Sequence, residues 1–338
     1  MARARLILSL LGLAALACAG PAAAQDDFYK GKTVEIIVGF GPGGGYDTYA
    51  RALGQFLPKH LPGQPTVIVK NMPGAGSLTL VNYLVNIAPK DGTSFGTFDQ
   101  SLILAPLFGG DAAKFDASKL SWVGSIAKGN TVCITWHTAE VKSWDDLTKK
   151  KAVFGGTGRE DVRYTHAAML RNMFGADLKI VTGYKGSSDL RIAMERGEID
   201  GTCGDSWTSL KSTAADWVRD KKINILVQFA LDTHPDVRDV PLLTEKARTD
   251  EDRAALKLLF AAQVAGRPFA GPPGVPAERL AVLRAAFDAT MKDPEFLAFT
   301  ERARLEVDAV GGRAIEALVG EVYQTPPAVI ARAKAVRE

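Results

Sequence analysis

A glycine-rich loop between an apolar run and an amphipathic run constrains this chain more than any other feature. The loop reads Val38-Gly39-Phe40-Gly41-Pro42-Gly43-Gly44-Gly45-Tyr46-Asp47. Val34, Ile36, Ile37 and Val38 are apolar as in a buried strand, and apolar residues after the loop recur at helical spacing. Glycines let a ligand approach the main chain, and the start of a helix offers unpaired N–H groups and a partial positive charge. The loop therefore predicts a site for an anion, such as a phosphate or a carboxylate.

The N-terminus carries the features of an export signal. Arg3 and Arg5 precede the apolar run 6–17, and Ala22-Ala23-Ala24 follows it. This order is typical of a secretory signal peptide, and we expect cleavage after Ala24. The apolar run is too short to span a bilayer, and no later segment approaches the ~20 apolar residues that a transmembrane helix needs. Cys18 leaves open the alternative of a lipid anchor.

Charge and length narrow the class of protein. The formal charge of the full chain is +3, and residues 1–24 hold two arginines and no acids, so the mature chain carries 3 − 2 = +1. Basic and acidic residues are interspersed, which argues against a nucleic-acid partner. The length exceeds that at which a single core usually stops growing, so we expect two lobes and, for the whole chain, a monomer.

The pattern of a strand, a glycine loop and a helix recurs along the chain. Strand-like residues 66–70 lead into Asn71-Met72-Pro73-Gly74-Ala75-Gly76, and residues 152–154 lead into Gly155-Gly156-Thr157-Gly158. Such alternation predicts an α/β fold in which each lobe has a mostly parallel sheet flanked by helices, with ligands beyond the carboxyl ends of the strands. The long extended run 122–136 suits a crossing between lobes. We therefore expect lobe 1 over 25–128, lobe 2 over 129–226, and a return to lobe 1 over 227–338.

Motifs for catalysis, cofactors and metals are weak. The glycine loop matches G-x-G-x-x-G, but the next strand ends in Val69-Lys70-Asn71, without the acidic residue that would hold a ribose. No Gly-x-Ser-x-Gly elbow and no Cys-x-x-Cys occurs, and His166 reads as a packed helix residue. We expect no catalytic residue, cofactor or metal. Cys133 and Cys203 are either a disulfide or two buried thiols.

Several side chains near the glycine turns are candidates for contact with a ligand. Tyr46 and Tyr184 each lie beside such a turn, with a place in the core as the alternative for both. Asp47 reads as the cap or first-turn acid of its helix. Asp205, just past the strand expected over 199–203, is a further ligand-binding candidate.

Short stretches along the whole mature length carry a resemblance to a known family. They are Gly41-Pro42-Gly43-Gly44-Gly45-Tyr46-Asp47, Asn71-Met72-Pro73-Gly74-Ala75-Gly76, Ala88-Pro89-Lys90-Asp91-Gly92, Tyr184-Lys185-Gly186-Ser187, His234-Pro235-Asp236-Val237-Arg238-Asp239-Val240-Pro241 and Gly271-Pro272-Pro273-Gly274-Val275-Pro276. In order and spacing the chain resembles the substrate-binding proteins of tripartite tricarboxylate transporters, the Bug-type periplasmic solute receptors.

That resemblance implies a type II, Venus-flytrap binding protein of the periplasm. Such a receptor captures a small carboxylated solute and hands it to separate membrane permease subunits. The resemblance also implies that main-chain N–H groups of one glycine loop per lobe hold the ligand carboxylate. Carried over by position, these are Gly43, Gly44, Gly45 and Asp47 in lobe 1, and Gly156, Thr157 and Gly158 in lobe 2.

The chain departs from the family between Gly158 and His166, where Arg159-Glu160-Asp161-Val162-Arg163-Tyr164-Thr165 is inserted. Arg159 or Arg163 could reach a second anionic group of the ligand, because arginine binds carboxylates in a bidentate manner. The alternative is a solvated helix start in which Arg163 pairs with Glu160 or a neighbour. Two rival functions stay open, a sensory receptor that signals to a membrane kinase and a secreted hydrolase.

Overall fold

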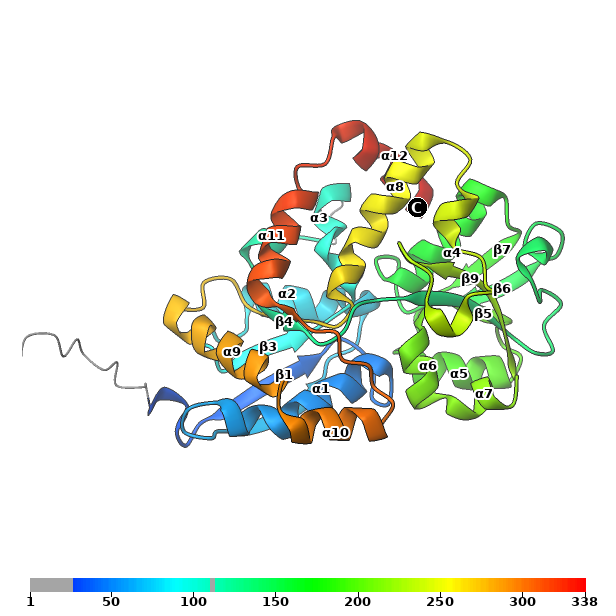
Figure 1. The fold of residues 1–338 in the computed structure, drawn as a ribbon. Helices are drawn as coiled ribbons and strands as arrows, with labels where there is room; N and C mark the ends of the chain where they lie inside the picture. The colour runs from blue at the N-terminus through cyan, green and yellow to red at the C-terminus, as the bar shows by residue number, and fades with distance from the viewer. Residues whose placement is uncertain (1–26, 110–112) are drawn as a thin grey trace, which may run out of the picture.

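The computed structural model describes residues 27–109 and 113–338, which form two lobes, each built on its own sheet (Figure 1). The first lobe is drawn in blue and cyan with orange and red helices, and the second in green. The expected signal peptide, its cleavage after Ala24 and Cys18 lie outside the described residues. No helix in the described part of the chain is long and apolar enough to cross a membrane.

The first lobe contains a six-stranded sheet ordered β11-β4-β10-β3-β1-β2. Its strands are β1 (Thr33–Val38), β2 (Thr66–Asn71), β3 (Ser94–Thr97), β4 (Ser121–Ser125), β10 (Pro268–Gly271) and β11 (Val310–Gly311). Its helices are α1 (Gly45–Phe56), α2 (Leu78–Asn86), α3 (Ala105–Phe108), α9 (Ala277–Thr290), α10 (Pro294–Arg302) and α11 (Gly312–Val322). The pairs β1–β2 and β1–β3 are parallel, whereas β10 runs antiparallel to β3 and β4.

The second lobe contains a five-stranded sheet ordered β7-β6-β8-β5-β9. Its strands are β5 (Thr131–Trp136), β6 (Ala152–Gly155), β7 (Leu178–Val181), β8 (Gly201–Ser206) and β9 (Ile223–Phe229). Its helices are α4 (Val162–Phe174), α5 (Ser187–Glu195), α6 (Trp207–Thr213) and α7 (Ala215–Arg219). β6 is parallel to β7 and β8, whereas β5 is antiparallel to β8 and β9.

The two-lobed α/β architecture confirms the predicted fold, but both sheets are mixed. Strands joined by a glycine loop and a helix are parallel, as the sequence pattern predicts. The strands that follow the crossings between lobes, β5 and β10, run opposite to their neighbours. Local patterning does not encode that direction, and the sheets are therefore less parallel than expected.

The run 122–136 crosses between the lobes, as predicted, because β4 and β5 belong to different sheets. The expected end of lobe 2 at residue 226 falls inside β9, which continues to Phe229. After β9, α8 (Asp250–Ala261) runs between the lobes, and α12 (Pro327–Arg337) packs against both α8 and α4 (Figure 1). Residues 227–338 therefore contribute to both lobes.

Short 3-10 turns connect these elements. They are η1 (Asp27–Tyr29), η2 (Leu57–His60), η3 (Ala75–Ser77), η4 (Gln100–Ile103), η5 (Ala117–Lys119), η6 (Trp144–Asp146), η7 (Pro235–Val237), η8 (Leu243–Lys246) and η9 (Ala262–Ala265). The helical run is broken before the proline pair at 326–327, as expected: α11 ends at Val322, Pro326 is the N-cap of α12, and Pro327 is its first residue.

Helix α1 shows how the first glycine loop is fixed to its sheet. Tyr49 and Leu53, one turn apart, are fully buried in a core shared with Val34 and Ile36 of β1. Gly54 lies so close to β2 that a Cβ there would be 2.9 Å from Val69 Cγ2. The small residue lets the helix approach the sheet closely, and this packing fixes the direction in which the start of α1 points.

Cys133 on β5 and Cys203 on β8 form a disulfide. The two strands are adjacent and antiparallel, and both cysteines are fully buried. Of the two alternatives that the sequence left open, the structure therefore has the bonded pair. The bond ties together two strands whose ends contribute residues to the cleft between the lobes.

Candidate functional site

A small cavity of about 20 Å³ lies between the lobes. Its lining residues are Gly45, Tyr46, Gln100, Thr131, Val162, Arg163, Ser187, Gly204, Asp205, Ser206, Ser209 and Arg267. Tyr46 lies in the first turn of α1, Arg163 in the first turn of α4, and Asp205 near the end of β8. These are carboxyl ends of strands and starts of helices, the positions at which α/β folds bind ligands.

The lobes are closed on each other around this cavity. Arg267, just before β10, donates from Nη2 to Ser209 Oγ on α6 of the other lobe over 2.7 Å. A Cβ at Gly45 would lie 2.2 Å from the same Ser209 Oγ, so only glycine fits there. A cavity of this size holds about one water molecule. Binding anything larger therefore requires the lobes to part or the lining side chains to move.

The first glycine loop already holds a carboxylate of its own chain. Asp47 lies in the first turn of α1, where Gly44 is the N-cap, and this confirms its interpretation as a first-turn acid. Its Oδ2 accepts from Gly43 N at 2.9 Å, and it also pairs with Arg51 and Asn71. Burial alone would raise the pKa of Asp47, but these hydrogen bonds hold it below its usual value. The Gly43 amide is therefore satisfied without a ligand.

The second glycine loop has the same arrangement. Thr157 N donates to Oδ2 of Asp161, the N-cap of α4, over 3.2 Å. A Cβ at Gly158 would lie 2.5 Å from the main chain of Gly76 in the other lobe, so this loop packs against the turn after β2. In both loops, a main-chain amide donates a hydrogen bond to the carboxylate of the aspartate four residues later in the sequence.

Only some of the ligand-binding candidates line the cavity. Gly45, Tyr46 and Asp205 do. Gly43, Gly44, Asp47, Gly156, Thr157, Gly158 and Tyr184 are not among the lining residues. The predicted contact of these seven with a ligand stays a prediction. In the closed arrangement several of them instead join the lobes, for example through Arg191 Nη2, which donates to Gly43 O at 3.1 Å.

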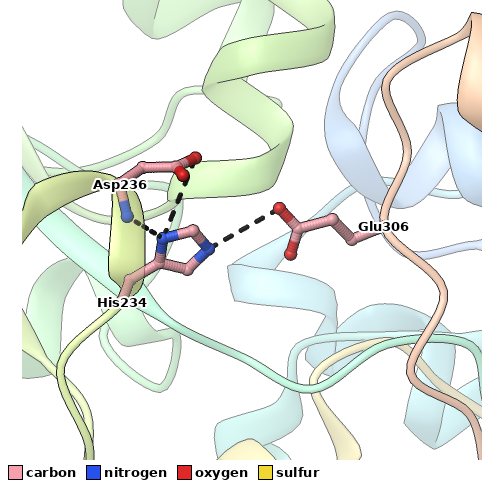
Figure 2. A group of neighbouring side chains, drawn as sticks. All are labelled: His234, Asp236 and Glu306. Carbon is pink, nitrogen blue, oxygen red and sulfur yellow. Dashed lines mark hydrogen bonds and ion pairs between the residues drawn. The ribbon is translucent and has the colours of Figure 1, made fainter.

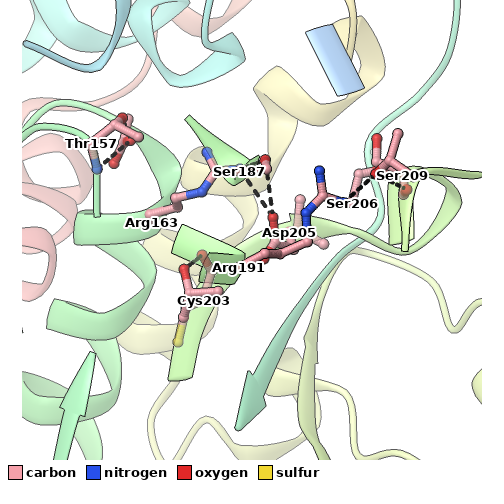
Figure 3. Close-up of polar contacts among 12 residues, drawn as sticks. Thr157, Arg163, Ser187, Arg191, Cys203, Asp205, Ser206 and Ser209 are labelled. Atoms are coloured by element: carbon pink, nitrogen blue, oxygen red, sulfur yellow. Dashed lines mark hydrogen bonds and ion pairs between the residues drawn. The ribbon is translucent and has the colours of Figure 1, made fainter. Parts of the chain in front are cut away.

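Arg163 points into the cavity rather than into solvent. Its side chain is 6% exposed, and Nη2 donates to Asp205 Oδ1 at 3.0 Å and to Ser187 Oγ at 2.6 Å (Figure 3). The alternative of a solvated helix start was wrong, because Arg163 is buried, and Glu160 pairs with Arg337 of α12 at 2.8 Å instead. Asp161 caps α4 and thereby fixes the first turn on which Arg163 lies.

Arg267 is the charged residue of the cavity that sequence reasoning missed. It is 6% exposed, and its guanidinium lies 4.5 Å from the centre of the Tyr46 ring. Nη1 donates to Gly266 O at 2.7 Å, while Nε has no hydrogen-bond partner. No salt bridge joins Arg267 to an acid among the described side chains. The sequence did offer one signal for Arg267: it is the one charged residue between Lys257 and Glu278.

His166 is a packed residue, as predicted. Its ring stacks on Phe229 with centroids 4.2 Å apart, and burial lowers its pKa to about 3. A neutral, fully buried imidazole of this kind contributes to the core under α4 rather than to acid–base chemistry.

Two buried carboxyl groups, Asp99 of the first lobe and Asp161 of the second, interact electrostatically. Asp99 Oδ1 accepts from both the N–H and the hydroxyl of Ser101, whereas Oδ2 has no hydrogen-bond partner among the described residues. Burial, followed by the negative charge of Asp161, raises the pKa of Asp99 to about 6. Burial likewise raises the pKa of Asp161. Two buried acids that interact in this way disfavour double ionisation.

Asp99→Asn is expected to raise the melting temperature at pH 7.5 by roughly 2–4 °C and to change it little at pH 4. The folded-state pKa lies above the ordinary value of 3.8. The stability that this group contributes is therefore fully present below about pH 4 and is lost as the pH rises through about 6. The measurement is thermal unfolding of both proteins from pH 4 to pH 8.

Asp116→Asn is the matched control for that prediction. Asp116 caps the N–H and the hydroxyl of Ser118 in the same way, but it is 40% exposed, and the hydrogen bonds from Ser118 lower its pKa. Its substitution should lower stability at pH 7.5 slightly rather than raise it. Equal effects of the two substitutions would show that burial of Asp99 is not the cause.

A group of His234, Asp236 and Glu306 has the ligand types of a metal site, with ligand atoms within 4.8 Å of one another (Figure 2). Lys211 Nζ already donates to Asp236 Oδ2 at 2.6 Å and to Glu306 Oε1 at 2.8 Å. The ammonium group therefore supplies the positive charge that these carboxylates need. We interpret the group as an ion-pair cluster that joins the lobes at their rim.

Comparisons with known proteins agree with this architecture. No family model matches the chain, and no curated protein matches its sequence. The solved structures do match. The periplasmic binding protein BugD has a TM-score of 0.73 at 20% identity, over 92% of this chain and 99% of its own.

Two further solved structures contain ligands. MatC from Rhodopseudomonas palustris with bound malate has a TM-score of 0.68 at 20% identity, over 91% of this chain and 99% of its own. An R. palustris protein with adipate has a TM-score of 0.67 at 18% identity, over 89% of this chain and 97% of its own. The chain therefore has the two-lobed fold of periplasmic binding proteins, and its resemblance to the Bug-type receptors extends to the three-dimensional structure.

Proposed function

We propose that this chain is a non-enzymatic receptor, exported to the periplasm, that captures a small carboxylate between its lobes. We further propose that it delivers this solute to the membrane permease subunits of a tripartite tricarboxylate-type transporter. The observation that carries the proposal is Arg267, a buried cation in the interlobe cavity with no acidic partner among residues 27–109 and 113–338.

A buried charge without a counter-charge is costly, and a bound anion removes that cost. A carboxylate at Arg267 can accept two N–H bonds from the guanidinium fork. Because Arg267 belongs to one lobe and Ser209, Arg163 and Asp205 to the other, the ligand would contact both lobes at once. Such a ligand binds the closed form better than the open form and so shifts the population toward closure.

The delivery step is supported by the fold and by the matching structures rather than by the site. BugD is a periplasmic binding protein, and the structures of two other neighbours contain malate and adipate. Deletion of the gene should abolish high-affinity uptake of the acid that the purified protein binds. Unchanged uptake in the deletion strain would contradict the transport role.

A thermal-shift screen of the mature protein tests capture directly. Residues 25–338 are incubated with a panel of small carboxylic acids and, in parallel, with the amide of each acid. A ligand at a hundred times its dissociation constant should stabilise the protein by about 2.7 kcal/mol, which corresponds to roughly 4 °C for a chain of this length. The acids should produce this rise and the amides should not. A rise with the amides alone would argue against a carboxylate receptor.

A further inference from the structure

We propose that the cleft selects a ligand with a single negative charge, a small monocarboxylate with a hydroxyl group, and that Asp205 excludes dicarboxylates. This inference rests on the proposed function and narrows its substrate class. Its basis is the balance of charges that line the cavity and the polar atoms there that have no partner.

The cavity is lined by three charged side chains, Arg163, Arg267 and Asp205. Arg163 has its counter-ion, because Asp205 Oδ1 lies 3.0 Å from Nη2. Asp161 and Asp99 also act electrostatically on Arg163. Arg267 has no such partner among the described residues. Because the positive charge of Arg267 is not compensated by the protein, a ligand with one negative charge would balance it.

A second carboxylate on the ligand would meet a negative charge where it needs a positive one. Asp205 is 7% exposed and already occupies the guanidinium group of Arg163. A dicarboxylate would have to displace Asp205 from Arg163 and leave this buried carboxylate without its ion pair, or lie beside it as a like charge. Both arrangements are unfavourable, because like charges and unpaired ions are poorly screened in a buried site.

The remaining polar atoms suit a neutral group that both donates and accepts. Gln100 Oε1 is a buried acceptor without a partner, and Arg163 Nε is a buried donor without one. A ligand hydroxyl is both a donor and an acceptor, so it can pair with a free acceptor or with a free donor of these lining residues. Val162 is the one aliphatic side chain among the lining residues, so the cavity offers little to an apolar tail. These features together indicate a small hydroxy monocarboxylate.

Calorimetric titration of the mature protein with lactate and malate tests the inference. The two acids differ by one carboxyl group and share the hydroxyl. The wild-type protein should bind lactate at least tenfold more tightly than malate, and propionate, which lacks the hydroxyl, more weakly than lactate. This comparison needs no variant and is therefore independent of any effect on folding.

The variant Asp205→Asn should move the preference toward malate by at least tenfold. The amide oxygen can still accept from Arg163, but the negative charge is gone, so Arg163 becomes available to a second carboxylate. Asp216→Asn is the matched control, because it makes the same charge change at a half-exposed site on α7 that does not line the cavity. The control should keep the wild-type preference.

The outcomes separate this inference from the proposed function. If the wild-type protein prefers malate, or if Asp205→Asn leaves the ratio unchanged, the single-charge inference is overturned while the carboxylate receptor stands. If no acid of either class binds but an uncharged solute does, the proposed function itself fails.

Discussion

Arg267→Met is expected to lower the affinity for the carboxylate ligand about 100-fold or more and to remove the ligand-induced rise in melting temperature. A charge-assisted hydrogen bond contributes roughly 1.5–3 kcal/mol, and the guanidinium fork would supply two of them. Methionine keeps much of the volume that Arg267 occupies beside Tyr46 and Tyr49. The unliganded protein should therefore stay folded, because the substitution also removes a buried charge that has no counter-ion. The measurement is calorimetric titration combined with thermal unfolding.

Arg267→Lys serves as the control for charge alone. Lysine keeps the positive charge but lacks the planar fork, so it should restore only part of the affinity that methionine loses. If Arg267→Met binds the acid as tightly as the wild-type protein does, the anchor lies elsewhere, and the main-chain amides of the two glycine loops become the leading alternative.

The fold was predictable because its main signals are local. The apolar run 36–38, the glycines after it and the helical spacing of Tyr49 and Leu53 all lie within one short segment. The same holds for the loop Gly155-Gly156-Thr157-Gly158 and for the proline pair before α12. Each of these features constrains backbone conformation or periodicity in its own neighbourhood. The direction in which β10 and β5 enter their sheets depends on the crossings between lobes, and no local pattern records it.

The site was less predictable because its residues meet only after folding. Arg267 lies far from Tyr46 and Ser209 in the sequence, and the three come together at the interface between the lobes. The glycine loops were correctly placed at helix starts. The spacing of residues in the sequence did not reveal that the side chains of Asp47 and Asp161 accept hydrogen bonds from the main-chain amides of these loops. Asp205 was among the predicted candidates, and its pairing with Arg163 required the structure.

Replacing Cys133 and Cys203 together with alanine is expected to lower the free energy of unfolding by about 4 kcal/mol in the chain-entropy model, since the bond closes a loop between residues 70 positions apart. Both side chains are fully buried in the core beneath α4, and alanine leaves no unpaired thiol there. Equilibrium urea denaturation with and without reductant measures the effect. Reductant should destabilise the wild-type protein by a similar amount and leave the double variant unchanged, which separates the loss of the cross-link from any packing defect.

Since Asp205 follows Cys203 by two residues on β8, the variant should also bind the ligand more weakly. Free thiols in the unfolded, purified wild-type protein, together with a wild-type transition that reductant does not move, would contradict the disulfide.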